Sequence, residues 1–213
     1  MKRIASFVLT AALVMGMGVS AFAAATPSKV VLDEVKADAT ATVSGISSVL
    51  GATVTIQKAE EAATTAAETK KVEEQTREVL ADVVKNVDLK EAISAVLPQE
   101  TAAASGTVKQ EEAKVEVAAV QTFSVETKRL GDSAKVEISL ESKMIDAVYK
   151  ENEELVVLVA VPSVDAATGK VVYTYKSVKA VYKDGQIKVQ LTGKQLKSFG
   201  ANFTVMALKK VKA

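Results

Sequence analysis

The chain has 213 residues and a formal net charge of +1, and it contains neither cysteine nor histidine. These two absences exclude disulfide-stabilised folds, thiol catalysis, the usual zinc sites and nucleophilic triads that use histidine. Aromatic residues make up 4% of the chain and tryptophan is absent, which argues against stacking platforms for carbohydrate or single-stranded nucleic acid. Valine, isoleucine and leucine must therefore supply the core.

The first 23 residues have the pattern of a secretory signal peptide. Met1-Lys2-Arg3 gives a positive start, residues 4–19 carry no charge, and Ala21-Phe22-Ala23 matches the small-x-small pattern of signal peptidase sites. The apolar run is shorter than the about 20 residues that a membrane-spanning helix needs. We expect cleavage between Ala23 and Ala24 and a secreted, extracytoplasmic protein without stable membrane insertion; an uncleaved N-terminal anchor is the alternative.

Charge is distributed unevenly over the rest of the chain. Residues 24–112 carry 9 basic and 15 acidic side chains, whereas residues 113–213 carry 16 basic and 11 acidic ones. The expected mature chain, residues 24–213, has 25 basic and 26 acidic side chains, because only Lys2 and Arg3 leave with the signal. The overall charge indicates no partner, but the contrast between the halves predicts two different regions.

The first of these regions, residues 24–98, is predicted to be mainly helical. Residues 53–57 alternate polar and apolar side chains, as in a short strand, and residues 59–86 have the composition of a helix. Asp88 stands at an N-cap position with Glu91 as its capping-box partner, which predicts a second short helix that ends at Pro98. The apolar face of the longer helix consists of Val72, Thr76, Val79, Leu80, Val83 and Val84. The sequence leaves three possibilities for that face: it packs on a sheet, it pairs with another copy, or it is exposed to solvent.

Residues 99–112 have no hydrophobic periodicity and few large apolar side chains, so they are predicted to be a linker. After them, apolar and polar residues alternate. Seven strands are predicted, at residues 114–120, 134–141, 154–161, 170–176, 178–183, 186–191 and 202–208, with a helical turn at Gln195-Leu196-Lys197. The fold class is therefore α+β: a short helical segment followed by an antiparallel β-sandwich, residues 113–213, of the immunoglobulin-like size.

Asp184-Gly185 gives the sharpest local prediction, a two-residue type I′ hairpin. Its register pairs Lys183 with Gln186, Tyr182 with Ile187, Ala180 with Val189 and Val178 with Leu191.

Residues 156–162, the Asp184-Gly185 hairpin and residues 203–208 together resemble a small β-rich module in secreted proteins of anaerobic Gram-positive bacteria. Those proteins join a signal peptide and a short helical segment to such a module. The resemblance covers roughly residues 88–208. It implies no catalytic residues, and the function of these proteins is generally unassigned.

Motifs for catalysis and metal binding are weak. The chain contains no Ser-x-x-Lys, no Gly-x-Ser-x-Gly and no phosphate-binding loop. The acidic pairs 60–61, 73–74, 111–112 and 153–154 favour solvated surface over glycoside hydrolysis, because adjacent carboxylates do not converge on a substrate. The loops at residues 165–169 and 146–154 lack the spacing of calcium ligands and favour turn chemistry. We therefore predict no catalytic residue, no cofactor and no metal.

Lysines dominate the end of the chain, where residues 165–213 hold ten of them against Asp165 and Asp184. The candidate polyanion-binding surface consists of Lys179, Lys183, Lys188, Lys209, Lys210 and Lys212. It would suit anionic cell-wall polymers or the acidic half of the chain itself, whereas the alternative is that these lysines protect a sheet face and edge from aggregation. Nucleic-acid binding is not expected, because Arg77 and Arg129 are the only arginines after the signal.

These observations predict an exported, non-enzymatic interaction or structural protein that binds an extracellular or cell-envelope component. One alternative is a cell-wall polymer binder that acts through the lysines. Another, from a different class, is a hydrolase with an unrecognised carboxylate or Ser-Lys site. The partner and the oligomeric state stay open.

Overall fold

The structure of the protein is a computed structural model that describes residues 38–44, 53–97, 114–141, 145 and 149–211. The strands are β1 (Asp38–Ser44), β2 (Thr53–Lys58), β3 (Lys114–Lys128), β4 (Lys135–Glu141), β5 (Glu154–Val164), β6 (Val171–Lys183), β7 (Gln186–Thr192) and β8 (Asn202–Val211). The helices are α2 (Ala59–Ala62), α3 (Ala66–Asn86), α4 (Leu89–Ser94) and α6 (Gly193–Phe199).

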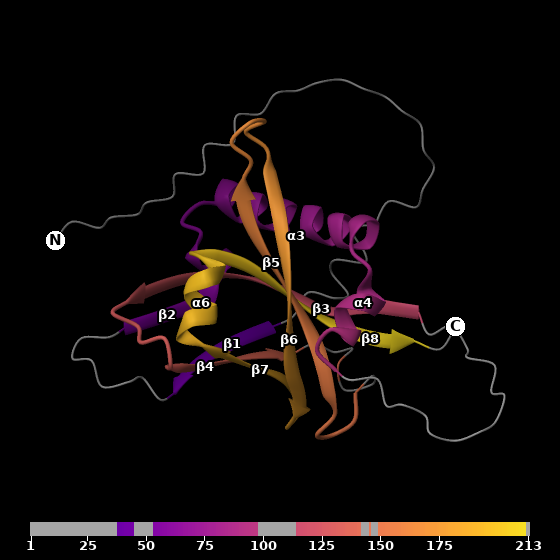
Figure 1. Cartoon of the computed structure of the whole chain (residues 1–213). Helices are drawn as coiled ribbons and strands as arrows, with labels where there is room; N and C mark the ends of the chain where they lie inside the picture. The colour runs from indigo at the N-terminus through magenta and orange to yellow at the C-terminus, as the bar shows by residue number, and fades with distance from the viewer. Residues whose placement is uncertain (1–37, 45–52, 98–113, 142–144, 146–148, 212–213) are drawn as a thin grey trace, which may run out of the picture.

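All these strands belong to one antiparallel sheet with the order β1-β4-β7-β6-β5-β8-β3-β2. The strands β1 and β2 follow each other in the chain but form opposite edges of the sheet, and they nevertheless approach within contact distance. The sheet must therefore curl until its edges come near each other, as the crossing directions of the strands in Figure 1 show. The result is a half-barrel.

The predicted β-rich antiparallel fold with few helices is confirmed, but the immunoglobulin-like sandwich is not. Two stacked sheets would require a break in the hydrogen bonding, and here β6 bonds to both β5 and β7, and β5 to both β6 and β8. The predicted strands 170–176 and 178–183 are one strand, β6. Both edges come from the region predicted to be mainly helical, since β1 pairs with β4 and β2 with β3.

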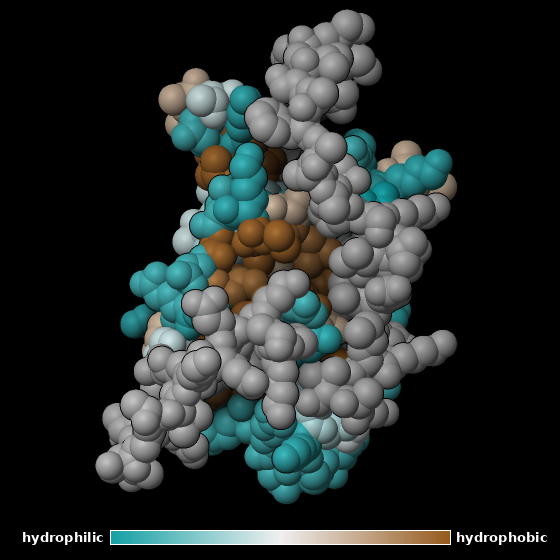
Figure 2. Space-filling view, turned by 90° about the vertical axis from the view of Figure 1, so that its right-hand side faces the viewer, coloured by the Kyte–Doolittle hydropathy of each residue, from teal (hydrophilic) through white to brown (hydrophobic). Residues whose placement is uncertain are grey.

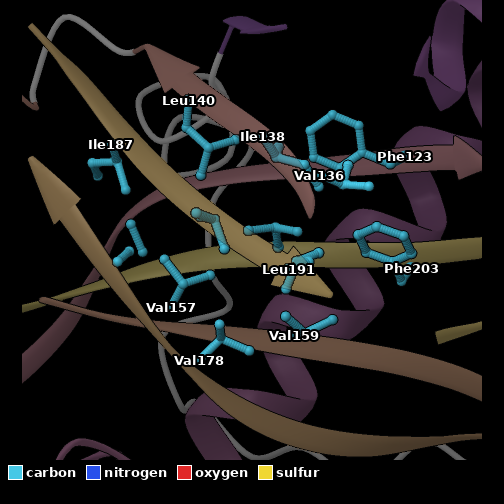
Figure 3. Packing of buried hydrophobic residues seen from close by; sticks show 14 of the residues in the cluster. Phe123, Val136, Ile138, Leu140, Val157, Val159, Val178, Ile187, Leu191 and Phe203 are labelled. Atoms are coloured by element: carbon cyan, nitrogen blue, oxygen red, sulfur yellow. The ribbon is translucent and has the colours of Figure 1, made fainter. Parts of the chain in front are cut away.

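The inner face of the curled sheet encloses the larger hydrophobic core. Alternate residues of the strands from β2 to β8 contribute to it, because side chains in a strand alternate between faces. Figure 3 shows Phe123, Val136, Ile138, Leu140, Val157, Val159, Val178, Ile187, Leu191 and Phe203 converging from several strands. Helix α6 adds Leu196 and Phe199 to this core, and the rings of Phe199 and Phe203 meet edge to face at 5.3 Å between centroids.

The second core lies between the outer face of the sheet and the helices α3 and α4. Val79, Leu80 and Val83 of α3 and Ile93 of α4 pack there against residues of β3, β5 and β8, and each is buried. Burial of such a side chain contributes about 1.5–3 kcal/mol. The predicted apolar face of the helix is thus packed on the sheet, except that Val84 was wrongly included. It is 72% exposed, because it lies one residue beyond the stripe.

The starts of both helices follow from their caps. Thr65 and Glu68 form a reciprocal capping box at α3. The N-cap predicted at Asp88 is confirmed: its Oδ1 accepts bonds from the backbone N–H groups of Lys90 at 2.9 Å and Glu91 at 3.1 Å. No returning bond from the Glu91 side chain is present at this described cap, so Asp88 caps α4 alone.

The hairpin at Asp184-Gly185 has the predicted turn, with φ of 55° and 76° at its two central residues. The pairings of Lys183, Tyr182 and Ala180 are confirmed, but Val178 does not pair with Leu191. The reason is that β7 leaves β6 beyond Val189 and stays with β4, where Leu191 lies opposite Val136. Val178 and Leu191 still share the inner core.

The side of the molecule where α4 and the ends of β3 and β8 lie is drawn in Figure 2. Hydrophobic residues gather in the middle of that face, with hydrophilic residues above and below them. None of the helices within the described ranges is long and apolar enough to cross a bilayer. The predicted signal peptide and the linker at residues 99–112 lie outside the described residues.

Candidate functional site

The lysines predicted to form one surface lie on two faces of the sheet. Lys179 and Lys183 of β6 and Lys188 of β7 share the outer face, because Lys188 lies opposite Val181, which has the same parity as both β6 lysines. Lys209 alternates in β8 with the same set as Val205 and Ala207, which face the inner core, so it lies on the inner face of the sheet. The backbone of Lys210 lies in β8, and Lys212 lies outside the described residues.

Three of the six lysines have acidic neighbours at close range. The ion pairs are Lys179 with Glu154 at 2.6 Å, Lys188 with Asp184 at 2.9 Å and Lys209 with Glu116 at 3.8 Å. The bond between Lys188 and Asp184 raises the pKa of the lysine and lowers the pKa of the carboxyl. Exposed pairs of this kind stabilise a fold by only about 0–1 kcal/mol, but they reduce the charge that a polyanion would meet.

The ribbon formed by β5 and β6 extends beyond its neighbours. The two strands pair from Glu154 and Val181 up to Val164 and Val171, whereas β8 pairs with β5 only over residues 156–160. Figure 1 shows the upper part of this ribbon projecting past α3, and none of the other described strands lies beside it. We call residues 161–172 the ribbon tip.

The loop at the ribbon tip is fixed by Asp165. Its Oδ1 accepts bonds from the backbone N–H groups of Ala167 at 2.9 Å and Thr168 at 2.7 Å, and from the Thr168 hydroxyl at 2.9 Å. These bonds, the one from the Thr168 backbone first, hold the pKa of Asp165 below its usual range. Gly169, with φ of 67°, closes the loop by donating to the Asp165 carbonyl at 2.8 Å. The carboxylate therefore serves its own turn, as predicted from the sequence.

Apolar side chains are exposed on both faces of the ribbon tip. Val164 is 61% exposed and Val172 is 43% exposed. Val164 has the same parity in β5 as Val156 and Leu158, which pack under the helices on the outer face. Val172 has the same parity in β6 as Val178, which faces the inner core. The tip thus presents apolar surface on a preorganised turn.

A polar contact joins the ribbon to α3. The Tyr175 hydroxyl donates to Asp82 Oδ2 at 2.5 Å, and Asn86 Nδ2 donates to Asp82 Oδ1 at 2.6 Å. Burial and this bond raise the pKa of Tyr175. Burial also raises the pKa of the neighbouring Tyr173 to about 12, with smaller contributions from the carboxylates of Glu78 and Asp82. Ring burial and hydrogen bonding together fix the angle between helix and ribbon.

A second polar contact anchors α3 to the sheet beneath it. The Thr122 hydroxyl lies 2.8 Å from the Thr76 hydroxyl and 2.9 Å from the Thr204 hydroxyl, and all three side chains are buried. Thr76 also donates to the Val72 carbonyl at 2.8 Å. Buried hydroxyl chains of this kind specify one seating of a helix, because any shift would leave polar groups unpaired.

Several of the acidic residues considered for hydrolysis or calcium binding have local contacts. Glu60 accepts a bond from Gln121 Nε2 at 2.8 Å, Glu153 accepts one from the Lys150 backbone at 2.8 Å, and Glu154 pairs with Lys179. Glu111 and Glu112 lie outside the described residues. Among the residues that the structure describes, no group of three or more Asp, Glu, His or Cys side chains has the arrangement of a metal site.

The chain was compared with protein families, curated proteins and solved structures, and no family model, curated protein or solved structure matches it. Sequence reasoning missed the ribbon tip and the contact between Tyr175 and Asp82. A signal for the contact was present, since tyrosines at 173 and 175 share one face of a strand and acids at 78 and 82 share one face of a helix.

Proposed function

We propose that the protein is an exported, non-enzymatic interaction protein that binds an extracellular or cell-envelope component through the ribbon tip. The observation that carries this proposal is the exposure of Val164 and Val172 at the end of a ribbon that projects beyond the rest of the sheet. Exposed apolar side chains on a rigid projection favour binding, because little conformational freedom is lost when a partner covers them.

The base of the ribbon supports the same proposal. Tyr175 and Asp82 hold it against α3, and the bonds of Asp165 hold the loop at its far end. A contact surface fixed at both ends can present the same side chains to each partner molecule. The signal-peptide pattern of residues 1–23 places that partner outside the cytoplasm in this proposal.

The test is a pull-down from cell-envelope extract with the wild-type chain and with the double variant Val164→Gln/Val172→Gln. Glutamine removes the apolar contact without adding charge. The expected result is a specific protein that the wild type retains and the double variant loses. Val84→Gln is the matched control, because Val84 is equally a valine with a large exposed fraction, but it lies on α3. Equal retention by all three chains would contradict the proposal.

The alternative function is binding of an anionic cell-wall polymer by the outer-face lysines. The observation in its favour is that Lys179, Lys183 and Lys188 lie side by side on that face. A polymer would have to compete with Glu154 and Asp184 for two of these lysines, so retention on isolated cell walls should fall steeply with salt. Retention that is indifferent to salt would exclude this alternative.

A further inference from the structure

One edge of the ribbon is unpaired from the ribbon tip down to residue 179. Over residues 171–179, β6 is paired with β5 on one side, while its pairing with β7 is confined to residues 180–183. No other described strand pairs with β6. We call residues 171–179 the free edge.

The backbone groups that face this edge can be identified from the hairpin. Lys183 and Gln186 flank a two-residue turn, so they exchange hydrogen bonds, and odd-numbered residues of β6 face the β7 side. Tyr182 confirms the alternation, because its N–H donates to the Glu153 carbonyl and its carbonyl accepts from Asn152, on the β5 side. The odd-numbered residues of the free edge therefore point their N–H and C=O groups outward.

The usual protection of such an edge is weak here. Natural edge strands are guarded by proline, bulges or lysines. The free edge has no proline, and its pairing with β5 is continuous. Lys179 is paired with Glu154, and Lys176 folds toward α6, where its Nζ contacts Ser198 at 3.1 Å and the Phe199 ring at 5.4 Å. Both lysines therefore have contacts within their own chain.

We propose that the free edge pairs with the same edge of a second copy of the chain, antiparallel about a two-fold axis at Tyr175. Tyr175 is the midpoint of residues 171–179, and its backbone N–H and C=O groups point away from β5. This register therefore uses the whole edge. It places Val172 opposite Val178 of the second copy and Thr174 opposite Lys176 of the second copy. No two like charges lie directly opposite each other, which makes the edge complementary to itself.

This inference concerns the backbone edge of β6, whereas the proposed function concerns the apolar side chains of the ribbon tip; the two regions share residues 171 and 172. Thr174 lies only in the free edge and Val164 lies only in the ribbon tip, so variants at these two positions test the two proposals separately. The proposed pairing adds that the exported protein would present two ribbon tips from one continuous sheet. If the wild type retains no partner in the pull-down, the proposed pairing of two copies is unaffected. If the chain is monomeric, the proposed function of the ribbon tip is unaffected.

The first test uses charge at Thr174, measured by sedimentation equilibrium on the chain expressed in full and purified as the cell processes it. Thr174 is exposed and lies opposite Lys176 of the second copy in the proposed register. Thr174→Lys should weaken dimerisation and Thr174→Glu should strengthen it, each by about two- to tenfold in Kd, since the pair occurs twice. Ser163→Lys and Ser163→Glu are the controls: Ser163 is exposed on the same face but lies on β5, and these variants should leave Kd unchanged.

The second test is a disulfide cross-link. Only the introduced cysteines can react, because the chain has no native cysteine. Thr174 and Lys176 of the second copy form a non-hydrogen-bonded pair, with Cα atoms about 4.5 Å apart, within disulfide reach. A mixture of Thr174→Cys and Lys176→Cys chains should give a disulfide-linked heterodimer on oxidation, in higher yield than Ser163→Cys mixed with Lys176→Cys. A chain that stays monomeric throughout the micromolar range, or a dimer that is indifferent to charge at Thr174, would overturn the proposal.

Discussion

The Tyr175 hydroxyl on β6 donates a 2.5 Å hydrogen bond to Asp82 Oδ2 on α3. The other oxygen of the same carboxylate accepts from Asn86, so both oxygens of Asp82 are engaged. This contact joins α3 to the projecting ribbon. A ribbon held in this way can act as a rigid contact surface.

Tyr175→Phe is expected to lower the free energy of unfolding by about 1–2 kcal/mol, because it removes a bond to a charged, half-buried acceptor. Urea denaturation followed by circular dichroism measures the loss. Tyr173→Phe is the control and should cost less, since no described residue forms a hydrogen bond of good geometry with that hydroxyl. A Tyr175→Phe chain as stable as the wild type would show that the contact does not hold the ribbon.

Stability should also fall at alkaline pH. The pKa values of Tyr149, Tyr173 and Tyr175 are all raised in the folded chain, mainly by burial, and that of Tyr173 reaches about 12. An unfolded tyrosine loses its proton near pH 10, as expected from its ordinary pKa of about 10. Above that pH the folded state binds more protons than the unfolded state. The stabilisation that comes from the raised pKa values is therefore complete below about pH 10 and is lost as pH rises toward the pKa values of the folded state.

The measurement is the urea midpoint at increasing pH, combined with phenolate absorbance. Tyr173→Phe should make the alkaline decline shallower, because one of the shifted groups is gone. A urea midpoint that stays constant well above pH 10, where most tyrosines of the unfolded chain are ionised, would contradict the burial of these rings.

Gly193 should be irreplaceable at the start of α6. A Cβ at this position would overlap the carbonyl oxygen of Gly131 and approach Leu130 Cγ to 3.1 Å. Gly193→Ala is therefore expected to destabilise the fold by about 1–3 kcal/mol, as overpacked core positions do. Thermal melting checks this value.

Gly169→Ala is the matched substitution at the ribbon tip. No atom lies within 4 Å of a Cβ there, but φ is +67°, so only backbone strain of about 1 kcal/mol is expected. If Gly169→Ala were the more damaging of the two variants, the close approach of the backbones at Gly131 and Gly193 would be in doubt.

Export is tested by the mass of the chain recovered from the culture medium. The predicted N-terminus is Ala24, after removal of residues 1–23. Ala23→Leu should block or shift the cut, since signal peptidase requires a small residue at that position. Recovery of the chain only in the membrane fraction, with Met1 intact, would favour the uncleaved anchor.

Local patterns predicted local structure well. The turn at Asp184-Gly185, the register around it and the strand at residues 53–57 follow from turn chemistry and alternation, which act within a few residues. The stripe from Thr76 to Val83 follows from helical period. Strand β1 was missed because its sequence, DATATVS, offers little apolar bulk.

Long-range features could not be predicted in the same way. The curl of the sheet depends on where β7 leaves β6, and nothing near Ala180 or Val189 in the sequence marks that point. Lys209 and Lys179 lie on opposite faces of the sheet, although both are in lysine-rich strands, because the two faces are assigned only once the strand pairing is known. The ribbon tip was missed because exposure of Val164 and Val172 depends on where neighbouring strands end.

The most direct test of the central claim is retention of an envelope protein by the ribbon tip, compared at low and high salt. We expect a protein partner to stay bound at high salt to the wild type and to Val84→Gln, and to be lost with Val164→Gln/Val172→Gln, because an apolar contact is little affected by screening. Retention only at low salt, and equal for all three chains, would contradict the ribbon tip as the working surface and favour the outer-face lysines.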